Sequence, residues 1–348
     1  MTRRLLPLLT ACALALAACG EKSEPEPGSA AGGGPAQPLR VMLDYFPNAD
    51  HAGIYAARES GAYAKAGLDV TITPPPDPSA PLKLLLAGKA DLAISYEPEL
   101  LLARDKGAEL VAVGALVQKP LTSLMAVGKA GVRTPQDLRG KRVGTAGIPY
   151  QSAYLETILE TAGVDPGSVR ETNVGFNLVP AMLSGKVDAT LGAFWNYEGT
   201  DLKRRGRDPV IQRIERLGVP TYAELVFVAR RRDLDEDFGS RLRRFMHATA
   251  RGHEALEADP QAGIEGLLKA DEGLDRGLQE AVVKATLPVF FPADEERPFG
   301  YQDLDEWQRY ADWMRDEGLV TQQLNAEQAA TNEFLPGEGL DPGRLSQD

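Results

Sequence analysis

Short apolar runs alternate with segments of helical spacing along most of this chain. Apolar runs bounded by Gly, Pro or Asp are typical of buried strands, whereas apolar residues spaced three or four apart are typical of helices. The pattern predicts strands at 39–44, 68–73, 92–95, 110–116, 124–127, 142–145, 189–193 and 224–229. It predicts helices at 50–60, 80–87, 151–162 and 179–183, and an almost wholly helical stretch at 233–334. Such alternation indicates an α/β fold.

A short sequence echo indicates that the fold contains two similar halves. Leu85–Asp91 reads LLAGKAD and precedes one predicted strand, while Met182–Asp188 reads MLSGKVD and precedes another. In both copies a glycine follows a predicted helix end, and an aspartate opens the turn into the strand. We therefore expect two α/β lobes of one architecture.

The lobes are expected to be built from three segments of the chain. Lobe 1 is assigned to 39–128 together with 223–340, and lobe 2 to 129–222, with a two-strand hinge near Lys129 and 220–224. Open α/β lobes bind ligands beyond the carboxyl ends of their strands. The candidate site is therefore expected where those ends face each other across the two lobes.

The N-terminus has the pattern of an export signal. Two arginines precede an apolar run, Leu5–Ala18, which is too short to span a bilayer as a helix. Leu16-Ala17-Ala18-Cys19 matches the lipobox of bacterial lipoproteins, so 1–19 is interpreted as a lipoprotein signal peptide with Cys19 as the acylated residue. An ordinary secretory leader is the alternative. Residues 20–38, rich in Gly, Pro, Ala and Glu, are expected to form a flexible tether outside the cytoplasmic membrane.

The composition argues against several classes of function. With 38 basic and 50 acidic residues the net charge is −12, and such a surface repels the phosphate backbone of nucleic acids. Two cysteines and three histidines cannot build a zinc cluster, and no CxxC pair is present, so neither a metal nor a cofactor is expected. Because GxSxG, P-loop, HExxH and strand-framed GxGxxG motifs are absent, we do not expect an enzyme.

Aromatic residues are concentrated in the segments that follow four of the predicted strands. These segments begin at Asp44, Tyr96, Ala146 and Phe194. Aromatic rings with a few polar groups among them are typical of a site for a flat, heteroaromatic ligand, although each ring alone could be core packing. The residues expected to contact the ligand from these segments are Asp44, Tyr45, Asn48, His51, Tyr96, Glu97, Tyr150, Trp195, Asn196, Tyr197 and Glu198.

Two glutamates carry the most specific chemical expectation. Glu97 and Glu198 follow equivalent strands in the two lobes, and an ionised carboxylate only accepts hydrogen bonds. They would suit a ligand that donates through amino groups, whereas the alternative is a solvated surface position for each. His51, just inside a predicted helix, is interpreted as a packing, capping or ligand-contacting residue. No nucleophile stands at a recognisable spacing from it for general-base catalysis.

The segment Leu43–Gly53, LDYFPNADHAG, resembles a motif of the NMT1/THI5-like family of periplasmic binding proteins. The resemblance covers about residues 39–315 and continues through 81–83, 88–96, 118–121 and 218–225. It implies a type II periplasmic binding protein fold. It also implies a receptor role in an ABC importer, with a permease and its ATPase as partners and no cofactor. Tyr222 and Glu224 lie in the last segment and complete the expected contact set.

The family implies two ligand classes and one enzymatic alternative. The chain is similar to receptors for N-formyl-4-amino-5-aminomethyl-2-methylpyrimidine, a thiamine precursor, so formylaminopyrimidine or hydroxymethylpyrimidine is the expected ligand. A neighbouring branch binds riboflavin, which is the alternative. A fungal pyrimidine synthase of the family consumes pyridoxal phosphate and its own histidine. His51 lies in the shared motif, but Gly192–Asn196 stands where that enzyme has a cysteine-rich motif. We expect a monomeric binding protein rather than a catalyst or a structural lipoprotein.

Overall fold

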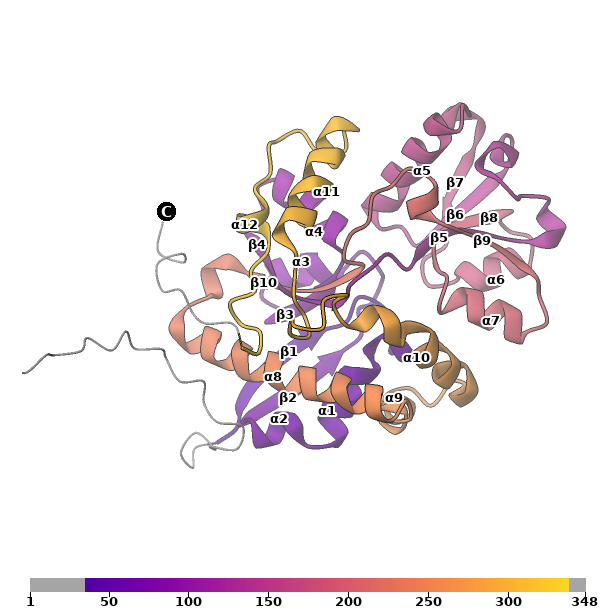
Figure 1. Ribbon diagram of the computed structural model, residues 1–348. Helices are drawn as coiled ribbons and strands as arrows, with labels where there is room; N and C mark the ends of the chain where they lie inside the picture. Colours follow the sequence, from indigo (N-terminus) through magenta and orange to yellow (C-terminus); the bar gives the residue numbers. More distant parts are fainter. Residues whose placement is uncertain (1–34, 338–348) are drawn as a thin grey trace, which may run out of the picture.

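The computed structural model describes residues 35–337, which form two α/β lobes side by side (Figure 1). The sheet of lobe 1 has the strand order β2-β1-β3-β10-β4, and that of lobe 2 has the order β7-β6-β8-β5-β9. In both sheets the first three strands are parallel, and the fourth runs antiparallel to its two neighbours. The expectation of two lobes with one architecture is confirmed.

Lobe 1 is formed from the two ends of the described chain. Its strands are β1 (Gln37–Met42), β2 (Leu68–Thr73), β3 (Leu92–Ser95), β4 (Leu110–Val117) and β10 (Leu225–Arg230). Its first helices are η1 (Ala49–His51), α1 (Ala52–Glu59), α2 (Ala62–Lys65), α3 (Pro81–Leu86) and α4 (Glu97–Asp105). After β10 follow η6 (Arg231–Asp233), α8 (Glu236–Ala258), α9 (Ile264–Ala270), α10 (Arg276–Phe290), α11 (Leu304–Asp316) and α12 (Ala326–Ala329).

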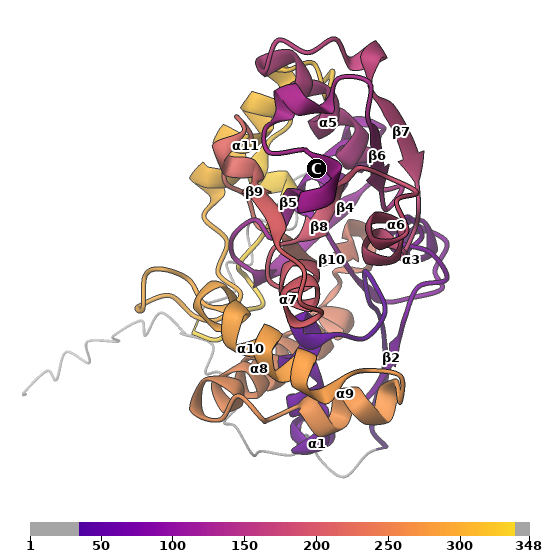
Figure 2. The same ribbon diagram turned by 90° about the vertical axis from the view of Figure 1, so that its right-hand side faces the viewer.

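Lobe 2 is formed from the middle of the chain. Its strands are β5 (Thr122–Val127), β6 (Arg142–Thr145), β7 (Arg170–Asn173), β8 (Ala189–Phe194) and β9 (Pro209–Arg213). Its α-helices are α5 (Pro149–Thr161), α6 (Leu178–Leu183) and α7 (Glu198–Arg204). Short 3-10 helices are η2 (Gly128–Ala130), η3 (Pro135–Leu138), η4 (Pro166–Ser168) and η5 (Ile214–Arg216). Figure 2 shows α7 lying against α10 of lobe 1, where the two lobes meet.

The chain crosses between the lobes at a different place from the one expected. Strand β5 pairs with β8 and β9, so lobe 2 already begins at Thr122. The first crossover is therefore 118–121, and the predicted boundary at 128 and hinge at Lys129 are wrong. An apolar run predicts a strand but does not indicate which sheet the strand joins. The second crossover, which ends where β10 begins at Leu225, agrees with the predicted hinge at 220–224.

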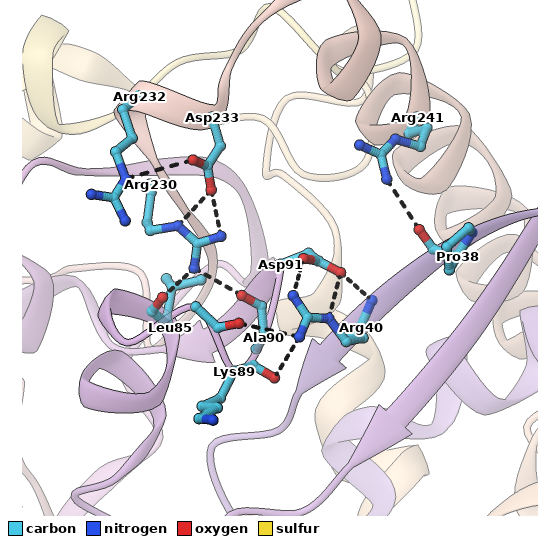
Figure 3. Close-up of polar contacts among 11 residues, drawn as sticks. Pro38, Arg40, Leu85, Lys89, Ala90, Asp91, Arg230, Arg232, Asp233 and Arg241 are labelled. Atoms are coloured by element: carbon cyan, nitrogen blue, oxygen red, sulfur yellow. Dashed lines mark hydrogen bonds and ion pairs between the residues drawn. The ribbon is translucent and has the colours of Figure 1, made fainter.

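The two copies of the sequence echo fold alike. Gly88 and Gly185 both have a φ of 72°, in the left-handed region that glycine adopts most readily at a helix end. Asp91 in lobe 1 accepts hydrogen bonds from the backbone N, Nε and Nη2 of Arg40 on β1 (Figure 3). In lobe 2 Asp188 accepts the same three bonds from Arg142 on β6. These Arg–Asp pairs fix the turn that leads into β3 and β8.

The elements that the apolar pattern did not predict lie mostly at edges. Strands β7 and β9 are edge strands, and β7 reads RETN with exposed or half-exposed side chains, so it has no apolar run to reveal it. Helix α4 begins directly at Glu97, where no helix was predicted. At the N-terminus, Gln37 and Pro38 pair with β2 and belong to a strand rather than the predicted tether.

The predicted signal peptide, Cys19 and most of the tether lie outside the described residues, and so do 338–340 of lobe 1. Within residues 35–337, the structure contains no helix with the length and apolar character needed to cross a membrane.

Candidate ligand-binding cleft

A pocket of about 430 Å³, including the part open to solvent, lies between the carboxyl ends of the strands of the two lobes. We call it the inner pocket. Lobe 1 lines it with Asp44, Tyr45, Asn48, Asp50, Tyr96 and Leu225, and lobe 2 with Ala146, Ile148, Gln151, Leu178, Gly192, Phe194, Tyr197 and Glu198. The strand ends therefore meet at one site, as the rule for open α/β sheets predicts.

Asp44 organises the lobe 1 wall of the inner pocket. It follows β1 and is buried, and both of its carboxyl oxygens are occupied by protein groups. Oδ1 lies 2.8 Å from Nε2 of His51, and Oδ2 accepts a hydrogen bond of 2.8 Å from the hydroxyl of Tyr96. Because both oxygens are occupied, Asp44 holds the wall in place and has less capacity left for a ligand.

His51 caps the start of the same segment instead of presenting a free ring nitrogen. Asn48 is the N-cap of η1, and its side chain accepts a hydrogen bond of 2.8 Å from the backbone N of Asp50. The backbone N of Asn48 in turn donates to Nδ1 of His51 at 3.3 Å. Since Nδ1 accepts, the proton of a neutral ring lies on Nε2, which donates to Asp44. His51 is fully buried, and both of its nitrogens are engaged.

Lobe 2 contributes a carboxyl and an amide to the opposite wall. Glu198, at the first position of α7, accepts a hydrogen bond of 2.7 Å from the backbone N of Phe194. Burial raises the pKa of Glu198 to about 8, opposed by its backbone hydrogen bonds. Gln151 accepts from the backbone N of Ala146 at 2.8 Å, and its amide lies against Gly192. A Cβ at Gly192 would come within 2.2 Å of Gln151 Nε2, so this approach requires glycine.

Aromatic rings from both lobes pack together at the mouth of the inner pocket. Tyr45 of lobe 1 meets Phe176 of lobe 2 edge to face, with ring centroids 4.6 Å apart, and Phe46 meets Tyr197 at 5.9 Å. Beyond them is an outer groove of about 1250 Å³, including the part open to solvent. The outer groove shares Tyr197 and Glu198 with the inner pocket and is also lined by Phe46 and Phe176. The lobes are closed around the inner pocket.

Three residues expected at the ligand lie at the hinge instead. Glu97 accepts a hydrogen bond of 2.8 Å from the backbone N of Ala223, on the second crossover. Glu224 accepts from the backbone N of Leu121 at 2.6 Å, on the first crossover, and of Thr122 at 2.8 Å, where β5 begins. The hydroxyl of Tyr222 donates to Glu224. None of the three lines the inner pocket, because their side chains satisfy the backbone groups of the crossovers.

Trp195, Tyr150 and Asn196 are likewise outside the pocket lining. Trp195 donates from Nε1 to the carbonyl of Pro120 at 3.0 Å, and the guanidinium of Arg213 lies 3.9 Å from its ring centroid. The stacking face that we expected it to offer is therefore covered. Tyr150 is fully buried beside Tyr96, with ring centroids 5.3 Å apart. Asn196 is buried between the lobes and bonds to lobe 1.

Sequence reasoning missed Asp50, Gln151 and Phe194 as contact residues, although all three lie in or beside the segments that it singled out. It also missed the apolar residues Ile148, Leu178 and Leu225. The signal for Asp50 was present, because it lies beside His51 in the segment that begins at Asp44. Within 35–337 no group of three His, Cys, Asp or Glu side chains is arranged to hold a metal ion.

The architecture and the interlobe pocket define a two-lobe solute-binding protein of the type II periplasmic kind. The model of the family described as NMT1/THI5 like matches residues 48–263. The chain belongs to this family.

Relatives of known name span most of the chain. The formylaminopyrimidine-binding protein of Halalkalibacterium halodurans is 34% identical over 84% of this chain and 88% of its own length. A protein of Haemophilus influenzae named for thiamine biosynthesis is also 34% identical, over 84% of this chain and 91% of its own. A 4-amino-5-hydroxymethyl-2-methylpyrimidine phosphate synthase of Legionella pneumophila is 26% identical, over 86% of this chain and 92% of its own length. A riboflavin-binding protein of Chloroflexus aurantiacus is also 26% identical, over 97% of this chain and 99% of its own length.

Solved structures share the fold. The alkanesulfonate-binding protein of Xanthomonas axonopodis, bound to MOPS, superposes with a TM-score of 0.66 at 19% identity. The alignment covers 86% of this chain and 99% of that protein. At this identity the likeness establishes the type II periplasmic binding fold and leaves the ligand open.

Proposed function

We propose that the protein is the extracytoplasmic, lipid-anchored receptor of an ABC importer and binds a thiamine-precursor aminopyrimidine in the inner pocket. Formylaminopyrimidine and hydroxymethylpyrimidine are the candidate ligands. The observation that carries the proposal is the lining itself. It combines aromatic rings with the carboxyls of Asp50 and Glu198, and none of the described lining side chains is basic. Such a lining favours a flat ligand that donates hydrogen bonds through amino groups.

Glu198 is suited to an aminopyrimidine in a further way. A carboxyl whose pKa is raised to about 8 is mostly protonated at neutral pH. A protonated carboxyl donates through its hydroxyl and still accepts through its oxygens. The amino group of an aminopyrimidine lies beside a ring nitrogen that accepts, so Glu198 can pair with both. A sulfonate would instead need arginines or helix N-termini in the lining.

Riboflavin is the second candidate ligand, supported by the relative of that name. Tyr45 of lobe 1 and Phe176 of lobe 2 meet edge to face across the cleft. This contact favours a single pyrimidine ring over a tricyclic flavin, because a larger ring system would have to separate them.

Calorimetric titration tests the ligand directly. We expect formylaminopyrimidine or hydroxymethylpyrimidine to bind with micromolar or tighter affinity, and riboflavin more weakly. Mass spectrometry of ligand co-purified with the native protein provides an unbiased check. Tight binding of an alkyl sulfonate without binding of either pyrimidine would overturn the proposal.

An enzymatic role is the alternative that the synthase relatives raise. The engagement of both His51 nitrogens argues against His51 as a general base, because a general base needs a nitrogen free to take a proton. We expect the pyrimidine to be recovered unchanged after prolonged incubation. Recovery of a modified pyrimidine, lost in His51→Ala, would make the protein a catalyst.

The anchor and the importer rest on the sequence and the family. We expect Cys19→Ser to abolish labelling by palmitate and to leave an unprocessed precursor, because acyl transfer needs the thiol. Labelling equal to that of the wild type would refute the lipobox. A permease with its ATPase is the partner proposed for a receptor of this fold, with the receptor itself a monomer.

A further inference from the structure

One buried carboxyl joins the two lobes directly at the inner pocket. Asp50, in η1 of lobe 1, is 1% exposed. Its Oδ1 accepts a hydrogen bond of 2.6 Å from Nδ2 of Asn196, in lobe 2. The same Nδ2 donates at 2.7 Å to the hydroxyl of Thr286 on α10 of lobe 1, and that hydroxyl lies 3.2 Å from Asp50 Oδ1. Asn196 is itself fully buried, and this latch joins residues of opposite lobes.

The second oxygen of the same carboxyl has no protein partner. Asp50 lines the inner pocket, and its Oδ2 is buried without a hydrogen bond from any residue in the described part of the chain. A buried carboxyl oxygen left unpaired is costly, because it has lost water and gained nothing. Around it stand Asp44, His51 and Glu198, of which His51 is already hydrogen-bonded to Asp44. None of these groups donates a hydrogen bond to Oδ2, so this oxygen remains able to accept one.

We propose that Asp50 couples ligand capture to closure of the lobes. Its Oδ2 accepts an N–H of the ligand, while its Oδ1 holds Asn196 of the opposite lobe. When the lobes are open, water hydrates the carboxyl. Closure without a ligand leaves Oδ2 buried without a hydrogen-bond donor, whereas closure around a ligand that donates there supplies the missing hydrogen bond. Closure thus depends on the presence of a suitably placed donor, and a ring without one is rejected. The chemical nature of this ligand rests on the proposed function, whereas the latch does not.

The first variant removes the acceptor and keeps the shape. Asp50→Asn retains an oxygen for Asn196 but turns an NH2 group toward the ligand donor. We expect the affinity for formylaminopyrimidine, measured by calorimetry, to fall roughly 10–100-fold, the range for hydrogen bonds to charged groups. Asp165→Asn is the matched control, because Asp165 is exposed and caps η4 on lobe 2. The control should bind like the wild type.

The second variant removes the latch and leaves the acceptor. Asn196→Ala should lower the affinity about threefold to tenfold and should leave the liganded protein more expanded in small-angle X-ray scattering. When Asp50→Asn and Asn196→Ala are combined, the fold-loss in affinity should be smaller than the product of the two single losses, because both changes act through one carboxyl. Thr286→Val removes the hydroxyl that Asn196 and Asp50 share, so the liganded protein should again be more expanded than the wild type. This variant is used in place of Asp50→Asn if the latter lowers the folded fraction.

The outcomes separate this inference from the proposed function. Wild-type affinity and compaction in Asp50→Asn and Asn196→Ala would overturn the coupling while leaving the pyrimidine receptor intact. If the wild type does not bind formylaminopyrimidine, the proposed function fails. The latch is then judged on the native protein with its co-purified ligand, by hydrogen exchange of η1 in Asn196→Ala. Faster exchange than in the wild type supports the latch, and unchanged exchange refutes it.

Discussion

The two lobes share a scaffold but differ in the side chains they place at the end of it. Their strand orders correspond, and each lobe has an Arg–Asp pair at the same place. Arg40–Asp91 joins β1 to the turn before β3, and Arg142–Asp188 joins β6 to the turn before β8. At the cleft, lobe 1 presents Asp44 and Asp50, whereas lobe 2 presents Gln151 and Glu198. The repeated sequence therefore specifies strand placement, while the segments outside the repeat specify the chemistry of the pocket.

Lobe 1 adds a second arginine to its copy of the turn. Arg230, at the end of β10, is 8% exposed and donates from Nη1 to the carbonyls of Leu85 and Ala90, at 2.9 Å for Ala90 (Figure 3). It also pairs with Asp233. The carbonyls of the lobe 1 turn are therefore buried against a charge supplied by the C-terminal half of the chain. This contact binds the returning strand to the first half of lobe 1.

The largest expected effect follows from this difference. Arg230→Met removes the donor of two buried carbonyls, so we expect the free energy of unfolding to fall by about 2–4 kcal/mol in denaturant titration. Arg40→Met and Arg142→Met, whose side chains are 48% and 40% exposed, should each cost much less than Arg230→Met. Arg232→Met, at 68% exposure, is the matched control and should cost less still. Equal losses for Arg230 and Arg142 would contradict the asymmetry.

A second contrast concerns the two glutamates that follow equivalent strands. Glu97 follows β3 and binds the second crossover, whereas Glu198 follows β8 and lines the inner pocket. Burial raises the pKa of both to about 8, with the backbone hydrogen bond of each acting in the opposite direction. The same residue type in the same place along the scaffold therefore serves the hinge in one lobe and the ligand in the other.

Glu198→Leu tests this contrast through binding. Leucine keeps much of the volume of the side chain but removes both the acceptor and the donor that would pair with the aminopyrimidine. We expect the affinity for formylaminopyrimidine to fall roughly 10–100-fold, about 1.4–2.8 kcal/mol, in calorimetric titration. Asp201→Asn, in the outer groove and paired with Arg205, should leave the affinity unchanged. A Glu198→Leu protein that binds as well as the wild type would place recognition elsewhere.

Glu97→Gln tests the hinge role through pH. In the folded protein Glu97 keeps its proton up to a pKa of about 8, against an ordinary value of 4.5, because it is buried. The folded state thus binds more protons between these values, so the free energy of unfolding falls as pH rises from about 5 to 8. In Glu97→Gln this decline should shrink by about 1–2 kcal/mol. The exposed Glu296→Gln should keep the wild-type slope, and a Glu97→Gln slope equal to it would contradict the prediction.

Much of the scaffold could be predicted from sequence, because burial on both faces produces continuous apolar runs. The bounds of β2, β3 and β6 agree with the runs that predicted them. Edge strands such as β7 could not be found in this way, since their side chains face solvent. Nor could the sheet joined by β5 be predicted, because pairing is decided by contacts far along the chain.

The sequence predicted which segments form the site, but not which of their side chains face the pocket. Spacing identifies which residues follow a strand, and the segments beginning at Asp44 and Phe194 do meet at the pocket. Spacing does not indicate the direction of a side chain once the strand has ended. Glu97 was therefore placed at the ligand although it points to the crossover, and Asp50 was passed over although it lines the pocket. Both outcomes depend on backbone groups that only the folded structure brings near.

The smallest expected effect separates two aromatic residues that the sequence treated alike. Trp195→Phe keeps a ring beneath the guanidinium of Arg213 and loses only the hydrogen bond from Nε1 to Pro120, so stability should fall by about 1 kcal/mol at most. Its affinity for formylaminopyrimidine should change less than about threefold, because the ring does not line the pocket. Tyr96→Phe, by contrast, deprives Asp44 of a donor within the pocket wall and should weaken binding more. If Trp195→Phe proves the more damaging to affinity, the lobe 2 ring reaches the ligand after all, and the division between hinge and pocket must be redrawn.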